Sequence, residues 1–183
     1  MTMKLPRINL LISALVFGIS IFSVIGYKVW QNNHYQSFDN NLRKESERLA
    51  NTSFPASPLI DLETKEDVSA NLKTGDFVLV YFSSNCEACK KELPILSQVQ
   101  SKTKASIFLI SAEEDEVIRN YANINNLKFK ILIDKNAESF KALSLKYTPT
   151  NLKVKNGVIQ KALIGSAPNE GAFLELARAG DDL

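Results

Sequence analysis

The sequence predicts an α/β domain, with helices covering a mixed sheet, preceded by one membrane-spanning helix. Three observations carry this prediction. Buried-strand patterns alternate with helical patterns along most of the chain, an antiparallel hairpin follows them, and residues 8–27 carry no charge. We expect three parts: an anchor at residues 1–30, a polar linker at 31–57 and the α/β domain at 58–183.

The composition of the 183 residues excludes several classes of protein. With 45% apolar residues, 22 Lys plus Arg and 20 Asp plus Glu, the chain can build one soluble core. No long basic block suggests nucleic acid binding. Two cysteines cannot make a disulfide-rich scaffold, and the single histidine, His34, argues against a histidine-based metal centre or triad.

The segment 8–27 is long enough to cross a bilayer, since a rise of about 1.5 Å per residue gives about 30 Å. Two cations, Lys4 and Arg7, precede the segment, whereas Lys28 is the only cation that follows it up to residue 42. The positive-inside bias therefore places the N-terminus in the cytoplasm. A cleaved signal peptide and a buried globular helix remain alternatives, although the apolar run is long for a signal peptide. We expect a single-pass protein of the cytoplasmic membrane, with its C-terminal domain on the periplasmic side.

The linker is polar, with a short helix expected over residues 40–50 and a spacer rich in Pro, Ser and Asn over 51–58. After a possible edge strand at 59–62, the domain is expected to have strands at 77–82, 106–111 and 129–133 and helices at 86–102, 113–126 and 136–145. Asn156-Gly157 indicates a hairpin between strands 150–155 and 158–164, and a helix follows at 168–179.

Both cysteines lie in one motif, Cys86-Glu87-Ala88-Cys89, between a buried strand and a helix. Ser84 and Glu87 fit a capping box, which puts Cys86 in the first turn, where the helix dipole stabilises a thiolate. One sulfur can attack a disulfide and the other can resolve the mixed disulfide. The alternatives are a zinc knuckle, which lacks a second ligand pair, and a closed structural disulfide, whose four-residue loop would stabilise the fold little.

Residues 82–94, FSSNCEACKKELP, resemble the active-site segment of thioredoxin-like proteins, in particular the membrane-anchored TlpA/ResA group. Pro94 matches a helix-kinking proline, residues 113–126 match an inserted helix, and residues 146–150 match the loop that carries a cis-proline, here Pro149. The resemblance covers roughly residues 58–178. Three features depart from it: Asn85 replaces a common tryptophan, the dipeptide Glu87-Ala88 contains no proline, and Val80 replaces the buried acid of thioredoxins.

The resemblance implies a role for each site residue. Cys86 and Cys89 form the redox-active disulfide, with Cys86 as the nucleophile and Cys89 as the resolving thiol. Glu92 exchanges a proton with Cys89, although a solvated helix glutamate is the alternative reading, and Thr148 and Pro149 offer backbone to the substrate. No cofactor or metal is needed beyond the cysteine pair.

The resemblance also implies partners: protein disulfide substrates, a membrane thiol donor of the CcdA/DsbD type, and apocytochrome c as a possible recipient of electrons. We expect the protein to be a monomer. We also expect it to reduce protein disulfides, because Glu87 and Glu92 are anions near the cysteine pair and disfavour a thiolate. An oxidant or isomerase with the same site, and a tethered binding or assembly module, remain open. A peroxiredoxin-like peroxidase is disfavoured, because the chain lacks the Pro-x-x-x-Thr-x-x-Cys segment.

Overall fold

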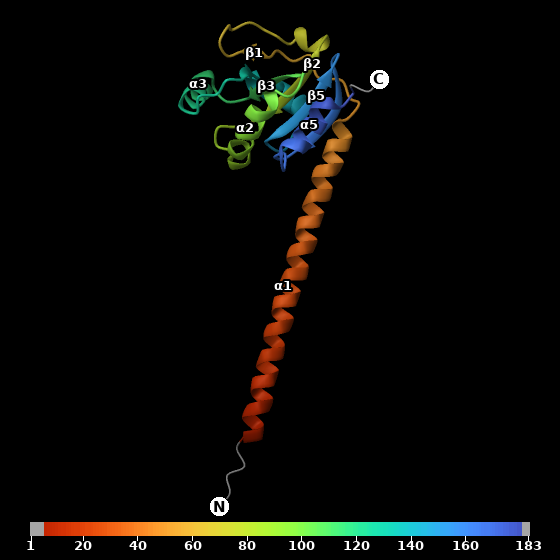
Figure 1. Ribbon diagram of the computed structural model, residues 1–183, viewed down its shortest axis with the longest axis vertical. Helices are drawn as coiled ribbons and strands as arrows, with labels where there is room; N and C mark the ends of the chain where they lie inside the picture. The colour runs from red at the N-terminus through yellow and green to blue at the C-terminus, as the bar shows by residue number, and fades with distance from the viewer. Residues whose placement is uncertain (1–5, 181–183) are drawn as a thin grey trace, which may run out of the picture. The chain divides into compact units, whose positions relative to one another are not determined.

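A computed structural model describes the backbone of residues 6–180 and the side chains of residues 23–180 (Figure 1). The chain divides into two compact units, residues 1–41 and residues 42–183. Helix α1 (Pro6–Leu49) is shared between them: residues 6–41 of the helix belong to the first unit, and its last two turns, residues 42–49, belong to the second. The second unit contains the sheet and all the other helices of the described chain.

The short helix expected over residues 40–50 is present up to Leu49, but it is the end of the longer helix α1, which also includes the rest of the expected linker from residue 31. The helix ends where Asn51 takes a positive φ of 61°, a left-handed conformation that asparagine tolerates well. Within the described side chains, no helix is both long and apolar enough to cross a membrane. Most of the predicted anchor, residues 8–22, lies outside those side chains and stays a prediction.

The sheet of the second unit is mixed and has the strand order β1-β4-β3-β2-β5-β6. Strands β2, β3 and β4 run parallel to one another, whereas β5 pairs antiparallel with β2, β6 with β5, and β1 with β4. The apolar run of β2 is central and buried from Val78 to Tyr81, as predicted. The bounds are β1 Ile60–Asp61, β2 Asp76–Tyr81, β3 Ser106–Ser111, β4 Lys130–Ile133, β5 Thr150–Lys155 and β6 Val158–Ile164.

Helices cover both faces of this sheet. On one face α2 and α5 lie side by side over a core that also receives Ile118 of α3 (Figure 1). The other face is covered by apolar residues around α4 and by Leu49 at the end of α1. The helical bounds are η1 Asn71–Lys73, α2 Glu87–Gln100, α3 Asp115–Ile124, η2 Lys135–Ala137, α4 Glu138–Ala142 and α5 Glu170–Arg178.

The helix expected over residues 136–145 is shorter and broken. Asn136 and Ala137 have positive φ angles of 57° and 53°, so a 3₁₀ turn comes first and α4 begins only at Glu138. The carboxylate of buried Asp134 accepts the backbone N–H groups of Ser139 and Phe140, as a capping residue does. Ser144, with a φ of 53°, prevents the helix from continuing.

The expected spacer also contains ordered backbone. Asn51 N–H donates to the Ile159 carbonyl at 2.7 Å, Ile159 N–H donates to the Thr52 carbonyl at 2.8 Å, and Phe54 N–H donates to the Gly157 carbonyl at 2.8 Å. Residues 51–54 therefore lie along the outer edge of β6, and the second unit begins well before residue 58.

Candidate active site

The two cysteines lie where β2 ends and α2 begins, and they form a disulfide. Cys86 is the N-cap of α2, and its Sγ accepts the backbone N–H of Cys89 at 3.1 Å. Cys86 is half-buried, whereas Cys89 is 2% exposed and belongs to the core between the sheet and α2. An incoming disulfide can therefore reach Cys86 far more easily than Cys89.

The predicted capping box of Ser84 and Glu87 is wrong, because the cap is Cys86. Ser84 instead bonds to Glu113, which follows β3: its N–H donates to Oε1 at 2.9 Å and its hydroxyl to Oε2 at 2.6 Å. Burial raises the pKa of Glu113, but the hydrogen bonds from Ser83 and Ser84 outweigh it and hold the pKa below its usual value. Glu113 thus fixes the turn that leads into Cys86.

From the sequence, Glu113 was expected only as the first residue of a helix over residues 113–126. A signal for it did exist, because β2 and β3 are parallel and their carboxyl ends meet at one edge of the sheet. Residues two or three positions beyond each strand therefore lie close together.

The loop before β5 lies against the disulfide. The Thr148–Pro149 peptide bond is cis, as predicted, and the Thr148 carbonyl oxygen is 3.3 Å from Cys86 Sγ. The pairing of Tyr81 with Thr150 in the antiparallel β2–β5 ladder brings the two segments together. Gly165 N–H donates to the Pro149 carbonyl at 2.8 Å, which ties the loop to the end of β6.

Glu92 is not a solvated helix residue: it is 1% exposed and lies one turn beyond Cys89 on the same face of α2. Its Oε1 accepts the Ala167 N–H at 2.6 Å and the Asn151 side-chain amide at 3.1 Å. Burial raises the pKa of Glu92 to about 7, although these two hydrogen bonds pull it down. A buried carboxyl with a pKa near neutrality can take up and release a proton under physiological conditions.

Two buried acceptor atoms of Glu92 and its partner Asn151 have no donor among the described residues. They are Glu92 Oε2 and Asn151 Oδ1. A proton on Glu92 would add a donor where two acceptors are unsatisfied, which favours the neutral acid. Sequence reasoning missed Asn151 and Ala167, because neither a strand asparagine nor a loop alanine signals a contact with a distant helix.

The anions that the sequence placed near the disulfide are not free charges. Glu87 forms an exposed ion pair with Lys90 at 2.7 Å. Burial raises the pKa of Glu92 to about 7, so this carboxyl is not a permanent anion at neutral pH. The expectation of a destabilised thiolate therefore cannot rest on these two carboxylates.

In the described part of the chain, no group of three or more His, Cys, Asp or Glu side chains is arranged to hold a metal ion. The chemistry that the described residues offer is the redox chemistry of the Cys86–Cys89 pair.

Comparison with known proteins gives this arrangement a context. The family model described as the AhpC/TSA family matches residues 51–164. The chain is 24% identical over 167 residues to the thiol-disulfide oxidoreductase ResA of a Bacillus cereus strain, covering 88% of this chain and 92% of that protein. It is 29% identical over 119 residues to the sporulation thiol-disulfide oxidoreductase A of Bacillus subtilis (strain 168), covering 61% of this chain and 72% of that protein.

A solved structure shows the same fold. The thio-disulfide isomerase from Thermus thermophilus has a TM-score of 0.62 and 26% identity, with 73% of this chain and 99% of that chain covered.

Proposed function

Since the chain belongs to the AhpC/TSA family of thioredoxin-like proteins, we propose that it reduces disulfide bonds in other proteins with Cys86 and Cys89. It is a thiol–disulfide oxidoreductase of the same type as ResA and the sporulation thiol-disulfide oxidoreductase A. The single observation that supports the proposed roles is the unequal burial of the pair: Cys86 is half-buried at the start of α2, while Cys89 is 2% exposed beneath it.

The reaction begins with the reduced dithiol. The Cys86 thiolate attacks one sulfur of the substrate disulfide, a Cys86–substrate disulfide forms, and the other substrate sulfur leaves as a thiolate that takes a proton. Glu92 accepts the proton of the Cys89 thiol, and the Cys89 thiolate attacks Cys86 Sγ. The Cys86–substrate disulfide breaks as the Cys86–Cys89 disulfide forms, and the second substrate sulfur leaves as a thiolate that takes up the proton released by Glu92. The substrate thus gains two electrons and two protons.

Thr148 and Pro149 provide the backbone beside which the substrate lies. The Thr148 carbonyl oxygen is 3.3 Å from Cys86 Sγ, which supports this role. A substrate chain that places its sulfur on Cys86 must therefore pass next to this peptide.

The direction of electron flow depends on how far the site stabilises the Cys86 thiolate. The N–H of Cys89 favours the thiolate, whereas the Thr148 carbonyl oxygen repels it and suits a thiol that can donate. With these two backbone groups in opposition, we expect a reductant rather than a DsbA-like oxidant, whose thiolate is strongly stabilised.

The site works outside the cytoplasm in this proposal. Residues 8–27 hold a monomeric chain in the cytoplasmic membrane with the thioredoxin-like domain on the periplasmic side, and a membrane thiol donor of the CcdA/DsbD type reduces the pair. The substrates are protein disulfides such as those of apocytochrome c. The uncharged segment 8–27, the flanking Lys4 and Arg7, and the likeness to ResA support this assignment.

A redox titration of the full-length protein tests the direction. The expected midpoint for the Cys86–Cys89 couple is below about −200 mV, nearer thioredoxin than DsbA. A midpoint near about −120 mV would establish the oxidant reading instead.

Insulin reduction by the full-length protein, compared with Cys86→Ser and Cys89→Ser variants, separates an enzyme from a tethered binding module. A binding module would retain its partner in both variants and would reduce no insulin in any form.

A further inference from the structure

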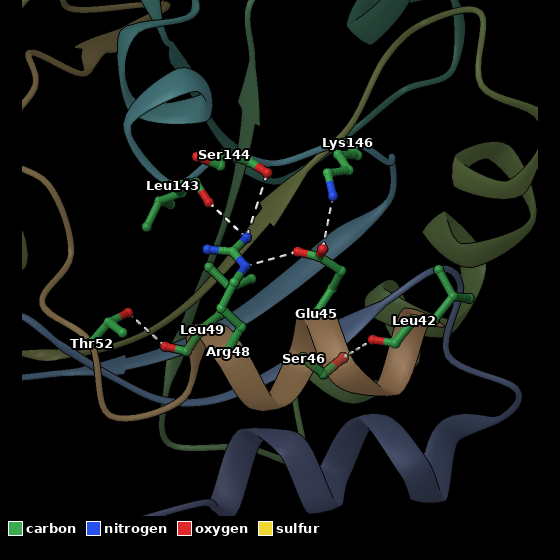
Figure 2. Close-up of polar contacts among 9 residues, drawn as sticks. All are labelled: Leu42, Glu45, Ser46, Arg48, Leu49, Thr52, Leu143, Ser144 and Lys146. Carbon is green, nitrogen blue, oxygen red and sulfur yellow. Dashed lines mark hydrogen bonds and ion pairs between the residues drawn. The ribbon is translucent and has the colours of Figure 1, made fainter. Parts of the chain in front are cut away.

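The last two turns of α1, residues 42–49, pack on the segment that leads to the cis-proline (Figure 2). Arg48 Nη2 donates to the Leu143 carbonyl at 2.9 Å and approaches the Ser144 carbonyl at 3.5 Å. Leu49, next to it, is 1% exposed and belongs to the core on that face of the sheet. The end of the helix is thus a structural part of the second unit.

The carbonyl groups that Arg48 binds lie at the C-terminal end of α4, where carbonyls lack partners within the helix. Ser144 has the left-handed φ of 53° that ends this helix. A guanidinium is well suited to this position, because it carries several donors in one plane and its positive charge is attracted to the negative, C-terminal end of the helix dipole.

A second contact extends this attachment towards the active site. Glu45 accepts Arg48 Nε at 2.9 Å through one oxygen and Lys146 Nζ at 2.9 Å through the other (Figure 2). Glu45 therefore joins the helix to the residue two positions before Thr148. Residues 143–146 are held at both ends by side chains of one helical turn.

The other support of the cis-proline also contacts α1. Gly165 donates its N–H to the Pro149 carbonyl at 2.8 Å. Leu42 Cδ1 lies 3.7 Å from the point where a Cβ on Gly165 would stand, so this side chain covers the glycine. The end of α1 consequently contacts residues 143–146, which precede Pro149, and also Gly165, which hydrogen-bonds to the Pro149 carbonyl.

We propose that Arg48 and Glu45 are positioning residues that hold residues 143–146, and through them the Thr148–Pro149 peptide, in place beside Cys86. The proposal rests on the proposed function, in which that peptide receives a protein substrate. It adds that the helix following the predicted anchor helps to set substrate binding as well as connecting the domain to it.

The central test is the Arg48→Ala variant of the full-length protein in detergent, with insulin and oxidised glutathione as the two substrates. We expect KM for insulin to rise about fivefold while kcat changes less than about twofold, because binding geometry is lost and the sulfurs remain. The loss with insulin should exceed the loss with glutathione, which needs little of the loop. Arg48→Lys, which keeps the charge and one donor, should recover part of KM.

The matched control is Arg43→Ala. Arg43 lies on the same helix and pairs only with exposed Glu47 among its described contacts, at 3.2 Å. The Arg43→Ala variant should reduce both insulin and glutathione at wild-type rates. Equal losses with insulin and glutathione, or equal effects of Arg43→Ala and Arg48→Ala, would overturn the proposal.

Two further measurements keep the test decisive. If Arg48→Ala fails to fold, Glu45→Gln and Lys146→Met replace it, each with an expected rise in KM of about two- to threefold. Hydrogen exchange of residues 143–151 should be faster in Arg48→Ala, or in these replacement variants, than in Arg43→Ala. Because exchange needs no substrate, it tests the positioning role even if the wild-type protein reduces nothing, a result that would refute the proposed function alone.

Discussion

Replacing Glu92 with glutamine should flatten the pH dependence of the protein's stability. The pKa of Glu92 is raised from an ordinary 4.5 to about 7 in the folded protein, chiefly by burial. Because the folded state holds the proton more tightly than the unfolded state, the resulting stability is complete below about pH 4.5 and is lost as the pH rises through about 7. The difference in pKa corresponds to about 3 kcal/mol of unfolding free energy.

Urea denaturation of the oxidised protein between about pH 5 and pH 8 measures this effect. Wild type should lose up to about 3 kcal/mol relative to Glu92→Gln across that range, since a glutamine keeps the acceptor for Ala167 and Asn151 and cannot ionise. Glu87→Gln, which removes an exposed carboxylate on the same helix, should leave the wild-type slope in place. Parallel curves for wild type and Glu92→Gln would refute the assignment of a near-neutral, buried carboxyl.

Three other predictions concern the cysteine pair, the end of α1 and the expected anchor. Cys89→Ser should accumulate mixed disulfides through Cys86, seen on non-reducing gels, because the resolving thiol is gone; turnover at the wild-type rate would reverse the two roles. Leu49→Ala should lower the unfolding free energy by about 2–5 kcal/mol, since it empties a buried position, and a loss below about 1 kcal/mol would mean that the end of α1 does not pack there. The full-length protein should stay with membranes after carbonate washing, and a mature chain with a new N-terminus near residues 27–35 would exclude the anchor formed by 8–27.

The pattern of the domain was predictable from sequence because its parallel strands are short apolar runs and its last two strands flank a clear hairpin signal. The strands at 106–111, 150–155 and 158–164 have the predicted bounds, and the central strand is offset by one residue. Asn156-Gly157 marked the hairpin, with φ angles of 52° and 74° that suit these two residues. Such local signals depend on residues close in the chain.

Contacts between distant segments were not predictable in the same way. The burial of Glu92 depends on Asn151 and Ala167, which come to α2 only through the order of the strands in the sheet. Likewise, the polar pattern of residues 31–49 indicated a linker, since the two apolar positions that dock, Leu42 and Leu49, are separated by charged residues. So short a docked stretch leaves too few apolar residues for a periodic signal.

The backbone of residues 51–54 along β6 has a consequence for how the protein meets other chains. An edge strand with free N–H and carbonyl groups is a template on which an unfolded polypeptide can pair, and proteins commonly cover or shorten such edges. Here the chain's own backbone hydrogen-bonds to Gly157 and Ile159 on one edge, and the opposite edge ends in β1, only two residues long. An unfolded polypeptide that meets this domain therefore finds little open sheet edge to pair with.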